Sequence, residues 1–386
     1  RNQPQPFAFA NYNGDASQTD IEDLARLLES QYGYEAGTFL DNPKTVQAEK
    51  FLVKFDYNIN DKHKLTARYS YSKGRAQKTN PSNSGNINFS NRYEFFPSTT
   101  HSAALELNST FNSKFSNRLI VGYTDVNDDR DPNGDPFPFV SIADGLGSIN
   151  FGSEQFSTAN NLQQTIFTVT DNFRIYAGRH NITIGTHNEF YDVHNLFVAQ
   201  NFGVYNYNDL ATFMSGGPAS FYARNYEIRG TEVDDEVGDD ITDAAADFNA
   251  AQLGFYVQDE YQLNQNFSLT AGVRVDVPIF GTDPTEDTDF NNTTIALLEA
   301  QHREDAEFNG LFNDDGTANF RAGSLPKSSL MIAPRVGFNW DLTGDDKYKL
   351  RGGVGLFTSR IPLVWPGGSF TNNGLNVGGI FTFTDE

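Results

Sequence analysis

The sequence predicts an all-β fold, an antiparallel up-and-down transmembrane β-barrel, from three observations. Apolar and polar residues alternate over five successive pairs of segments. The composition includes 34 Phe, 17 Tyr and 33 Gly, which favours strands and turns over helices. The connections within the pairs are short, whereas those between the pairs are long. Mean hydropathy is -0.51 and no run of about eighteen apolar residues occurs, which excludes a transmembrane helix.

Charge and cysteine content narrow the classes of function. The formal net charge is -22, so nucleic acid is excluded as a partner, because its binding needs a basic surface. Cations remain possible ligands. The chain has no cysteine, which removes disulfides and thiolate chemistry.

The first 47 residues are predicted to be an extracellular loop with one short amphipathic helix, from about Asp20 to Tyr32. Thr19 and Glu22 form a capping box at its start. Four apolar side chains share one helix face: Ile21, Leu24, Leu27 and Leu28.

Residues 48–357 are predicted to form five β-hairpins. The last is the clearest, because Val336, Phe338 and Trp340 alternate with Arg335, Gly337 and Asn339 before a turn at TGDD. The earlier pairs are AEKFLVKFDYN with KLTARYSYSK, HSAALELNSTF with RLIVGYTDV, TIFTVTDNFRI with NITIGTHNEFYDV, and QLGFYVQDEYQ with FSLTAGVRVD. Residues 358–386 are predicted to begin a further extracellular loop.

The lengths of the connections alternate in a way that a soluble sandwich or propeller would not require. Turns within the hairpins span about four to six residues, whereas loops between them span about 27, 38, 58 and 55. Every long loop therefore falls at the same end of the hairpins. Outer-membrane barrels have this polarity, with short periplasmic turns and long extracellular loops. The remaining alternative is a soluble β-sandwich with one wet face.

The two faces of the strands predict where ligands bind. Polar positions would face the lumen, and they include Lys54, Arg68, Glu106, Glu260, Arg274 and Arg351. We expect ligand binding by lumen and loop residues, with these candidates: Arg68, Arg274, Arg335, Arg351, Tyr205, Tyr207 and Trp365. The loop tyrosines could equally pack the loops together. Aromatic residues near strand ends predict interfacial girdles: Tyr57, Tyr69, Tyr71, Tyr123, Tyr261 and Trp340.

No pattern indicates an enzyme. Gly352, Gly353 and Gly355 lie within a strand rather than at a strand-to-helix turn, so they do not form a phosphate loop. A possible calcium loop has oxygen ligands at alternate positions, Asp129, Asp131, Asn133 and Asp135. Its twelfth position is Val140, so the bidentate Glu is missing, and a solvated acidic turn is the alternative.

Three motifs resemble TonB-dependent outer-membrane receptors, specifically their Oar-like branch. They are FLVKFDYNINDKHKLTARYSY at Phe51–Tyr71, FYVQDEYQLNQNFSLTAGVRVDVP at Phe255–Pro278, and APRVGFNWDLTGDDKYKLRGGVGLFTSRIPLVW at Ala333–Trp365. The resemblance implies a barrel of about twenty-two strands, closed around a plug and energised through TonB. With about ten strands and no plug or TonB box, the chain is expected to be one partial barrel domain, a fragment from the middle of the barrel.

The resemblance also implies a function and partners. We expect a bacterial outer-membrane protein whose loops and lumen bind an extracellular ligand for energised uptake. Its expected partners are outer-membrane lipid, the TonB system through a plug domain, and a possible surface lipoprotein. The alternative is an Oar-like surface barrel that acts in adhesion or protein export without nutrient transport.

Overall fold

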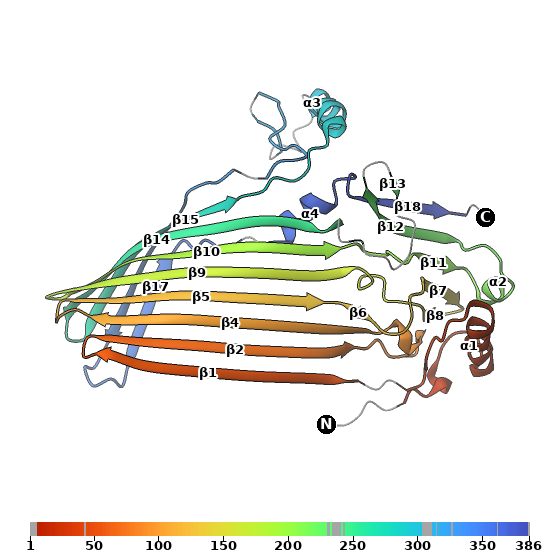
Figure 1. Ribbon diagram of the computed structural model, residues 1–386, viewed down its shortest axis with the longest axis horizontal. Coiled ribbons are helices and arrows are strands. Elements are labelled where there is room, and N and C mark those ends of the chain that lie inside the picture. The colour runs from red at the N-terminus through yellow and green to blue at the C-terminus, as the bar shows by residue number, and fades with distance from the viewer. Residues whose placement is uncertain are drawn as a thin grey trace.

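The main element of the protein is one curved antiparallel sheet (Figure 1). The computed structural model describes residues 6–41, 44–229, 232–233, 241, 244–302, 311–313, 315–325, 327–360 and 362–384. Ten long strands follow one another in the order β1-β2-β4-β5-β9-β10-β14-β15-β16-β17, with β6 paired to β4. Within the described residues the sheet is not closed, and β1 and β17 are its edges. The predicted all-β fold and its five hairpins are confirmed.

The strands are longer than the sequence pattern indicated. Their bounds are β1 Val46–Asn60, β2 His63–Lys78, β4 Glu94–Thr110, β5 Phe115–Asp129, β6 Asp131–Pro132, β9 Asn160–Ala177, β10 His180–Phe197, β14 Ala246–Asn264, β15 Phe267–Phe280, β16 Met331–Asp341 and β17 Lys349–Gly355. Beyond the apolar segments, polar residues continue the same backbone pairing toward the long loops. The turn end and the loop end of the sheet lie on opposite sides of the molecule (Figure 1).

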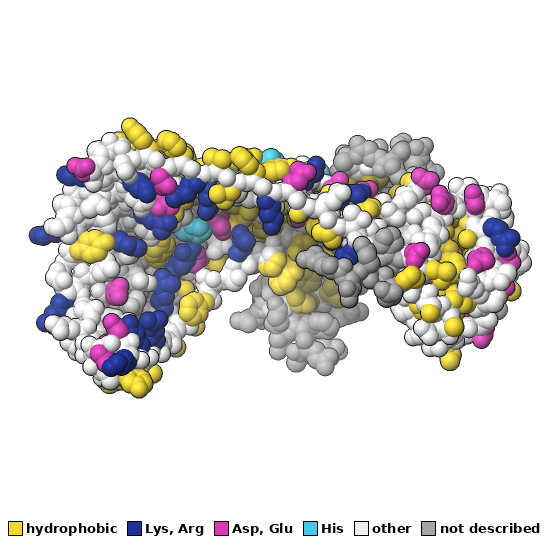
Figure 2. Space-filling model, turned by 90° about the horizontal axis from the view of Figure 1, so that it is seen from below, with side chains coloured by type: hydrophobic (Ala, Val, Ile, Leu, Met, Phe, Trp, Pro, Cys, Tyr) yellow, Lys and Arg dark blue, Asp and Glu magenta, His cyan; other side chains and the backbone are white. Residues whose placement is uncertain are grey.

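The outer face of the sheet is apolar and exposed. Large side chains remain more than half exposed there, including Phe51 at 56%, Phe55 at 60%, Leu105 at 53% and Phe255 at 56%. A continuous apolar surface of this extent is unfavourable in water and is typical of a lipid-facing barrel wall. The inner face is polar, and Figure 2 shows Lys and Arg side chains gathered along the concave side near the turn end.

An aromatic row marks the loop-side border of the apolar surface. Direct cross-strand partners in this row are Val53, Tyr69, Ala103, Tyr123, Phe167 and Phe190. The next outer-face row toward the loops contains Phe51, Tyr71, His101, Asp125, Thr165 and Asp192, so it is polar from β4 to β10, whereas on β1 and β2 the apolar surface extends one row further. The expectation that Tyr69, Tyr71 and Tyr123 lie near strand ends was wrong, because the strands continue beyond this border as a polar wall. Tyr57, Tyr261 and Trp340 do lie near the turn end.

The long loops fold into a second sheet at the loop end. Its order is β13-β12-β11-β7-β8-β3, and β18 also pairs with β12. The pairs β3 with β8 and β7 with β11 are parallel. The bounds are β3 Asn86–Asn88, β7 Phe139–Asp144, β8 Gly147–Phe151, β11 Val204–Tyr207, β12 Phe221–Arg229, β13 Glu232–Val233 and β18 Val377–Phe383. This sheet, with helices α1 (Gln18–Tyr32) and α2 (Leu210–Met214), is called the cap below.

The cap has its own hydrophobic core. Ile21, Leu24 and Leu28 of α1 are fully buried against side chains of the small sheet and of α2: Ile87, Ile142, Ile149, Phe151 and Phe213. Ser17, rather than Thr19, is the N-cap, and its side chain and Asp20 form the capping box. The predicted capping pair, Thr19 and Glu22, was therefore wrong by two residues. The predicted apolar face was right.

A buried carboxylate ties together the loop ends of neighbouring strands of the main sheet. Glu94, at the start of β4, is 2% exposed. Its Oε1 lies 2.8 Å from Lys78 Nζ and 3.2 Å from Arg130 Nη1. These contacts fix the loop ends of β2 and β4 and the residue that follows β5, which are the points from which the segments leading to β3 and β7 leave the main sheet.

The remaining helices are short. They are η1 (Phe9–Asn11), η2 (Ser90–Arg92), η4 (Phe290–Thr294), α3 (Ile295–His302) and α4 (Val364–Thr371). Among the described residues, no helix has the length and apolar character needed to cross a bilayer.

We predict that Leu24→Ala loosens the cap without disrupting the main sheet. Removing a fully buried leucine side chain costs about 2–5 kcal/mol, and Leu24 contacts only the cap core. Hydrogen exchange should become faster in β7 and β8 and remain unchanged in β1 and β2. Glu29→Ala, on the exposed side of α1, is the matched control. Equal acceleration in both sheets would contradict an independent cap core.

Two buried tyrosines, Tyr34 and Tyr93, and the half-buried Tyr12 should ionise late and destabilise the cap when they do. Burial, and for Tyr12 a hydrogen bond to Asp144, raises the pKa of Tyr12 and Tyr34, and burial raises the pKa of Tyr93 to about 12. A raised pKa stabilises the folded state fully below the unfolded value of about 10 and progressively less above it. In an alkaline titration, tyrosinate absorbance should rise first from exposed tyrosines, and the late phase should coincide with faster proteolysis of the cap. A single phase centred near pH ~10 would contradict this.

Candidate functional site

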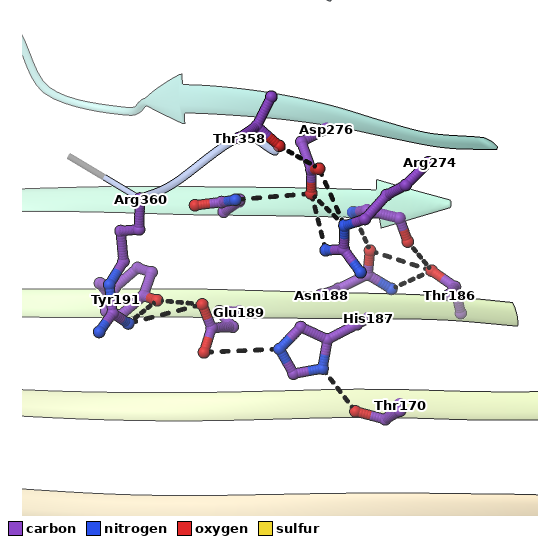
Figure 3. Close-up of polar contacts among 12 residues, drawn as sticks. Thr170, Thr186, His187, Asn188, Glu189, Tyr191, Arg274, Asp276, Thr358 and Arg360 are labelled. Carbon is purple, nitrogen blue, oxygen red and sulfur yellow. Dashed lines mark hydrogen bonds and ion pairs between the residues drawn. The ribbon is translucent and has the colours of Figure 1, made fainter. Parts of the chain in front are cut away.

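The inner face of β9, β10, β14 and β15 carries a network of polar side chains (Figure 3). His187, Glu189 and Tyr191 occupy alternate positions of β10, so all three point to the same face. Arg274 and Asp276 occupy alternate positions of β15 and point to the same side. The alternation of the strands therefore concentrates ionisable groups from segments far apart in the sequence.

The first group is centred on Asp276, which is completely buried. Arg274 Nε lies 2.8 Å from Oδ2, and its Nη2 lies 2.7 Å from Oδ1. Thr358 Oγ1 donates to Oδ2 at 2.8 Å. Gly254 leaves room for the guanidinium, because a Cβ there would collide with Arg274 Nη2. A buried carboxylate with a bidentate arginine and a hydroxyl donor is fully compensated.

The second group runs across β9 and β10 to a later segment. Thr170 Oγ1 and His187 Nδ1 are 2.6 Å apart, and His187 Nε2 lies 3.6 Å from Glu189 Oε1. The Tyr191 hydroxyl donates to Glu189. Arg360 contacts both Tyr191 and Glu189. The result is a continuous chain of hydrogen bonds and ion pairs across the inner face.

Residues 358–371 lie over this network, and we call their described part the strap. Thr358 and Arg360 bind the two polar groups, and Phe370 of α4 stacks on Phe248 of β14 with ring centroids 5.0 Å apart. A small cavity of about 40 Å³ lies between the strap and β10, β14 and β15. The strap therefore lies against the inner face of the sheet, and its place at the start of an extracellular loop stays a prediction.

The predicted lumen arginines all occupy inner-face positions, but the structure brings only Arg274 and Arg335 near one another, both close to Tyr256. Arg274 belongs to the network, whereas Arg68 lies on β2 at the other side of the sheet. Arg335 sits beside an open depression of about 540 Å³ that is floored partly by glycines of β16 and β17. Arg351 Nε donates to Asn339 Oδ1 at 3.3 Å. Lys54, Glu106 and Glu260 share this face through the strand register.

The predicted loop aromatics differ in their surroundings. Tyr205 packs on Tyr222 with centroids 4.7 Å apart, and Tyr207 packs edge-on to Phe213 at 5.0 Å. Both rings contact the cap core, which favours the packing interpretation. Trp365 lies in α4 and is 72% exposed.

The possible calcium ligands do not converge on one point. Asp131 is part of β6 and pairs with Arg75 at 2.8 Å. The Asn133 side-chain amide donates to the Ser90 carbonyl at 3.1 Å. In the described part of the chain, no three His, Cys, Asp or Glu side chains are grouped as metal ligands would be. Calcium binding by Asp129, Asp131, Asn133 and Asp135 stays a prediction without geometric support.

Several network residues were not predicted from the sequence. His187, Glu189 and Tyr191 could have been found, because strand alternation alone places them in one row. Thr358 and Arg360 could not, since their partners lie far away in the sequence and no periodicity specifies where an irregular segment folds. The arrangement offers charged and hydrogen-bonding groups that are covered by a segment that contacts them through side chains.

We predict that Asp276→Asn releases the strap and destabilises the sheet. The substitution leaves Arg274 as an uncompensated charge, and breaking a buried ion pair costs about 3–5 kcal/mol. Protease cleavage within residues 358–363 should become faster. Thr358→Val should release the strap with a smaller loss of stability. Arg351→Gln is the control, because it changes an inner-face arginine that does not contact the strap. Unchanged cleavage in both test variants would contradict the assignment of Asp276 as an anchor.

Comparisons with known proteins agree with this architecture. A family profile described as "Outer membrane beta barrel domain" matches residues 9–383. The comparison with curated proteins gave no match. Similar solved structures include the outer membrane transporter YddB from Escherichia coli, at 12% identity and TM-score 0.47, covering 81% of this chain and 32% of that one. Ferric citrate transporter FecA has 10% identity and TM-score 0.43, covering 81% and 36%. Copper transporter OprC has 12% identity and TM-score 0.44, covering 83% and 39%.

Proposed function

The chain belongs to the family of outer membrane beta barrel domains, and from this premise we propose that it forms part of the wall of an energised outer-membrane transporter. The chain spans about a third of the length of the solved structures described above. The activity of the whole protein is therefore part of the proposal. The ligand would bind to the inner face and the cap before energised uptake.

The observation that carries the proposal is the strap anchored on the inner face. A barrel wall that served only as a surface anchor would need no buried, fully paired polar network in its interior. Here Asp276 and Glu189 hold the first part of the strap, at Thr358 and Arg360, through hydrogen bonds and ion pairs, whereas Phe370 holds its second part in an apolar cluster with Phe248. A ligand or a neighbouring domain that offers similar groups could exchange with Thr358 and Arg360 without leaving charges unpaired.

The orientation follows from the same proposal. The cap would face the exterior, where it would meet ligands, and the short turns would face the periplasm. The outer apolar face contacts outer-membrane lipid. Energy would reach the barrel from the TonB system through a plug domain, and a surface lipoprotein could sit on the cap as a partner in ligand capture.

Uptake by the complete protein in its native outer membrane tests the proposal. Cells with and without the gene would be offered three labelled probes: a ferric siderophore, an oligosaccharide and an oligopeptide. We expect one probe to accumulate at least ten-fold more in cells that carry the gene. The accumulation should disappear when a protonophore removes the proton-motive force.

The strap variants provide the structural control. Thr358→Val should change the accumulation of the same probe, whereas Lys114→Gln, in the exposed turn between β4 and β5, should leave it close to that of the unmodified protein. A gene deletion that changes surface adhesion or protein export but alters accumulation of none of the probes would instead support the adhesion or export alternative.

A further inference from the structure

A polar patch interrupts the apolar outer face of the sheet. It consists of Asn117 on β5, Asp171 on β9, and Thr186 and Asn188 on β10. Asp171 is directly paired with Leu119 and Thr186 in the sheet register, which places it on the outer face. Asn117 Nδ2 donates to Asp171 Oδ1 at 2.7 Å. Thr186 and Asn188 are hydrogen-bonded to each other through their side chains at 2.9 Å.

Asp171, Thr186 and Asn188 lie inside the apolar surface, whereas Asn117 is two residues from the turn end of β5 and continues a row formed by His63 and Ser109. On β9, Asp171 stands between Val169 on the loop side and Phe173 on the turn side, with Phe167 and Ile175 one position further on each side. On β10, Thr186 and Asn188 stand between Ile184 and Phe190, which are 50% and 43% exposed. Asp171, Thr186 and Asn188 are therefore at the depth where the outer face should contact lipid tails.

Lipid is a poor environment for these groups. A carboxylate at this depth has no water to solvate it, and polar side chains in membranes are expected to face protein or a water-filled space. The donor in the hydrogen bond from Asn117 is a neutral amide, so it does not supply a positive charge to balance the carboxylate. In the described part of the chain, Asp171 forms no ion pair, and Asn117 Oδ1 is buried without a hydrogen-bond partner.

A second copy docked through the same face would not supply the missing charge. On the described outer faces of the ten long strands, the Lys and Arg side chains are Lys73 and Arg75, both toward the loop end of β2. The outer-face histidines each contact a side chain of this chain already: His63 contacts Ser109, His101 contacts Tyr69, His180 contacts Asp259 and His194 contacts Asp247. Arg75 already pairs with Asp131 and stacks on Phe95. Lys73 and Arg75 lie on the loop side of the aromatic row, away from the depth of Asp171. The cation must come from a different surface.

We propose that the patch is the centre of an interface, within the membrane, with a different outer-membrane protein. The partner surface is apolar and carries one Lys or Arg that pairs with Asp171, and its polar groups meet Asn117, Thr186 and Asn188. This proposal rests on the membrane location of the sheet and does not depend on transport.

Site-specific photocrosslinking in the native outer membrane tests the interface. The complete protein would carry a benzophenone amino acid at Asn188 or, as a control, at Val257, which is 43% exposed on the same face. We expect a discrete protein adduct from position 188 and none from 257. Mass spectrometry of the adduct should identify a membrane-embedded partner segment that contains a Lys or Arg.

Dependence on Asp171 separates the proposed contact from chance proximity. Asp171→Leu should lower the adduct yield at least ten-fold, whereas Asp125→Leu, on the same face beyond the aromatic row, should not. Asp171→Lys should abolish the adduct, and an acidic residue in place of the partner's cation should restore it. Heat-resistant migration in gels verifies that each barrel is folded, and Asp171→Asn preserves the side-chain shape if Asp171→Leu does not fold.

Three results would overturn the proposal. The first is that position 188 yields only lipid adducts, like position 257. The second is an adduct of twice the mass of the complete protein, which would identify a second copy. The third is an adduct whose yield is the same in the presence and absence of the Asp171 carboxylate.

Discussion

The structure depends on one constraint: the outer face of a single sheet contacts lipid, whereas its inner face is polar. Each strand must alternate apolar and polar side chains with a period of two, and each backbone N–H and C=O within the bilayer must be paired. The ten strands are hydrogen-bonded side by side in sequence order, and this pairing satisfies both the alternation and the backbone hydrogen bonds. Both the exposed phenylalanines outside and the buried Asp276 inside follow from this alternation. A side chain of the wrong polarity therefore carries information, and Asp171 is the example on the outer face.

The main sheet could be predicted because its signals are local. Period-two alternation, turn residues such as TGDD and the unequal connections are all visible in short windows of sequence. The cap could not be predicted in the same way, since its strands are short and two of its pairs are parallel contacts between different loops. One part had a readable signal. Val140, Ile142, Ile149 and Phe151 alternate around an Asp-Gly turn, which is a typical hairpin pattern.

The sequence predicts which residues face the lumen, but not which side chains they contact. Strand parity places Arg274 and Arg335 on the lumen side, and the structure agrees. The alternation along a strand does not specify which side chains contact each other. It therefore could not show that Arg274 pairs with Asp276, or that Arg335 lies beside a depression lined by glycines. The strap has no periodic pattern at all. Its position follows from tertiary contacts of Thr358, Arg360 and Phe370, which exist only once β10, β14 and β15 are side by side.

The cap also has a consequence for assembly. Its sheet combines segments from the loops after β2, β5 and β10 with β18 from beyond β17, so it can close only when every hairpin stands in its correct order. A strand displaced by a single residue would turn its side chains to the opposite faces and shift the attached loop. Glu94, which needs both Lys78 and Arg130, would then lose its counterions. The cap therefore adds its stability only to a main sheet whose strands are correctly paired.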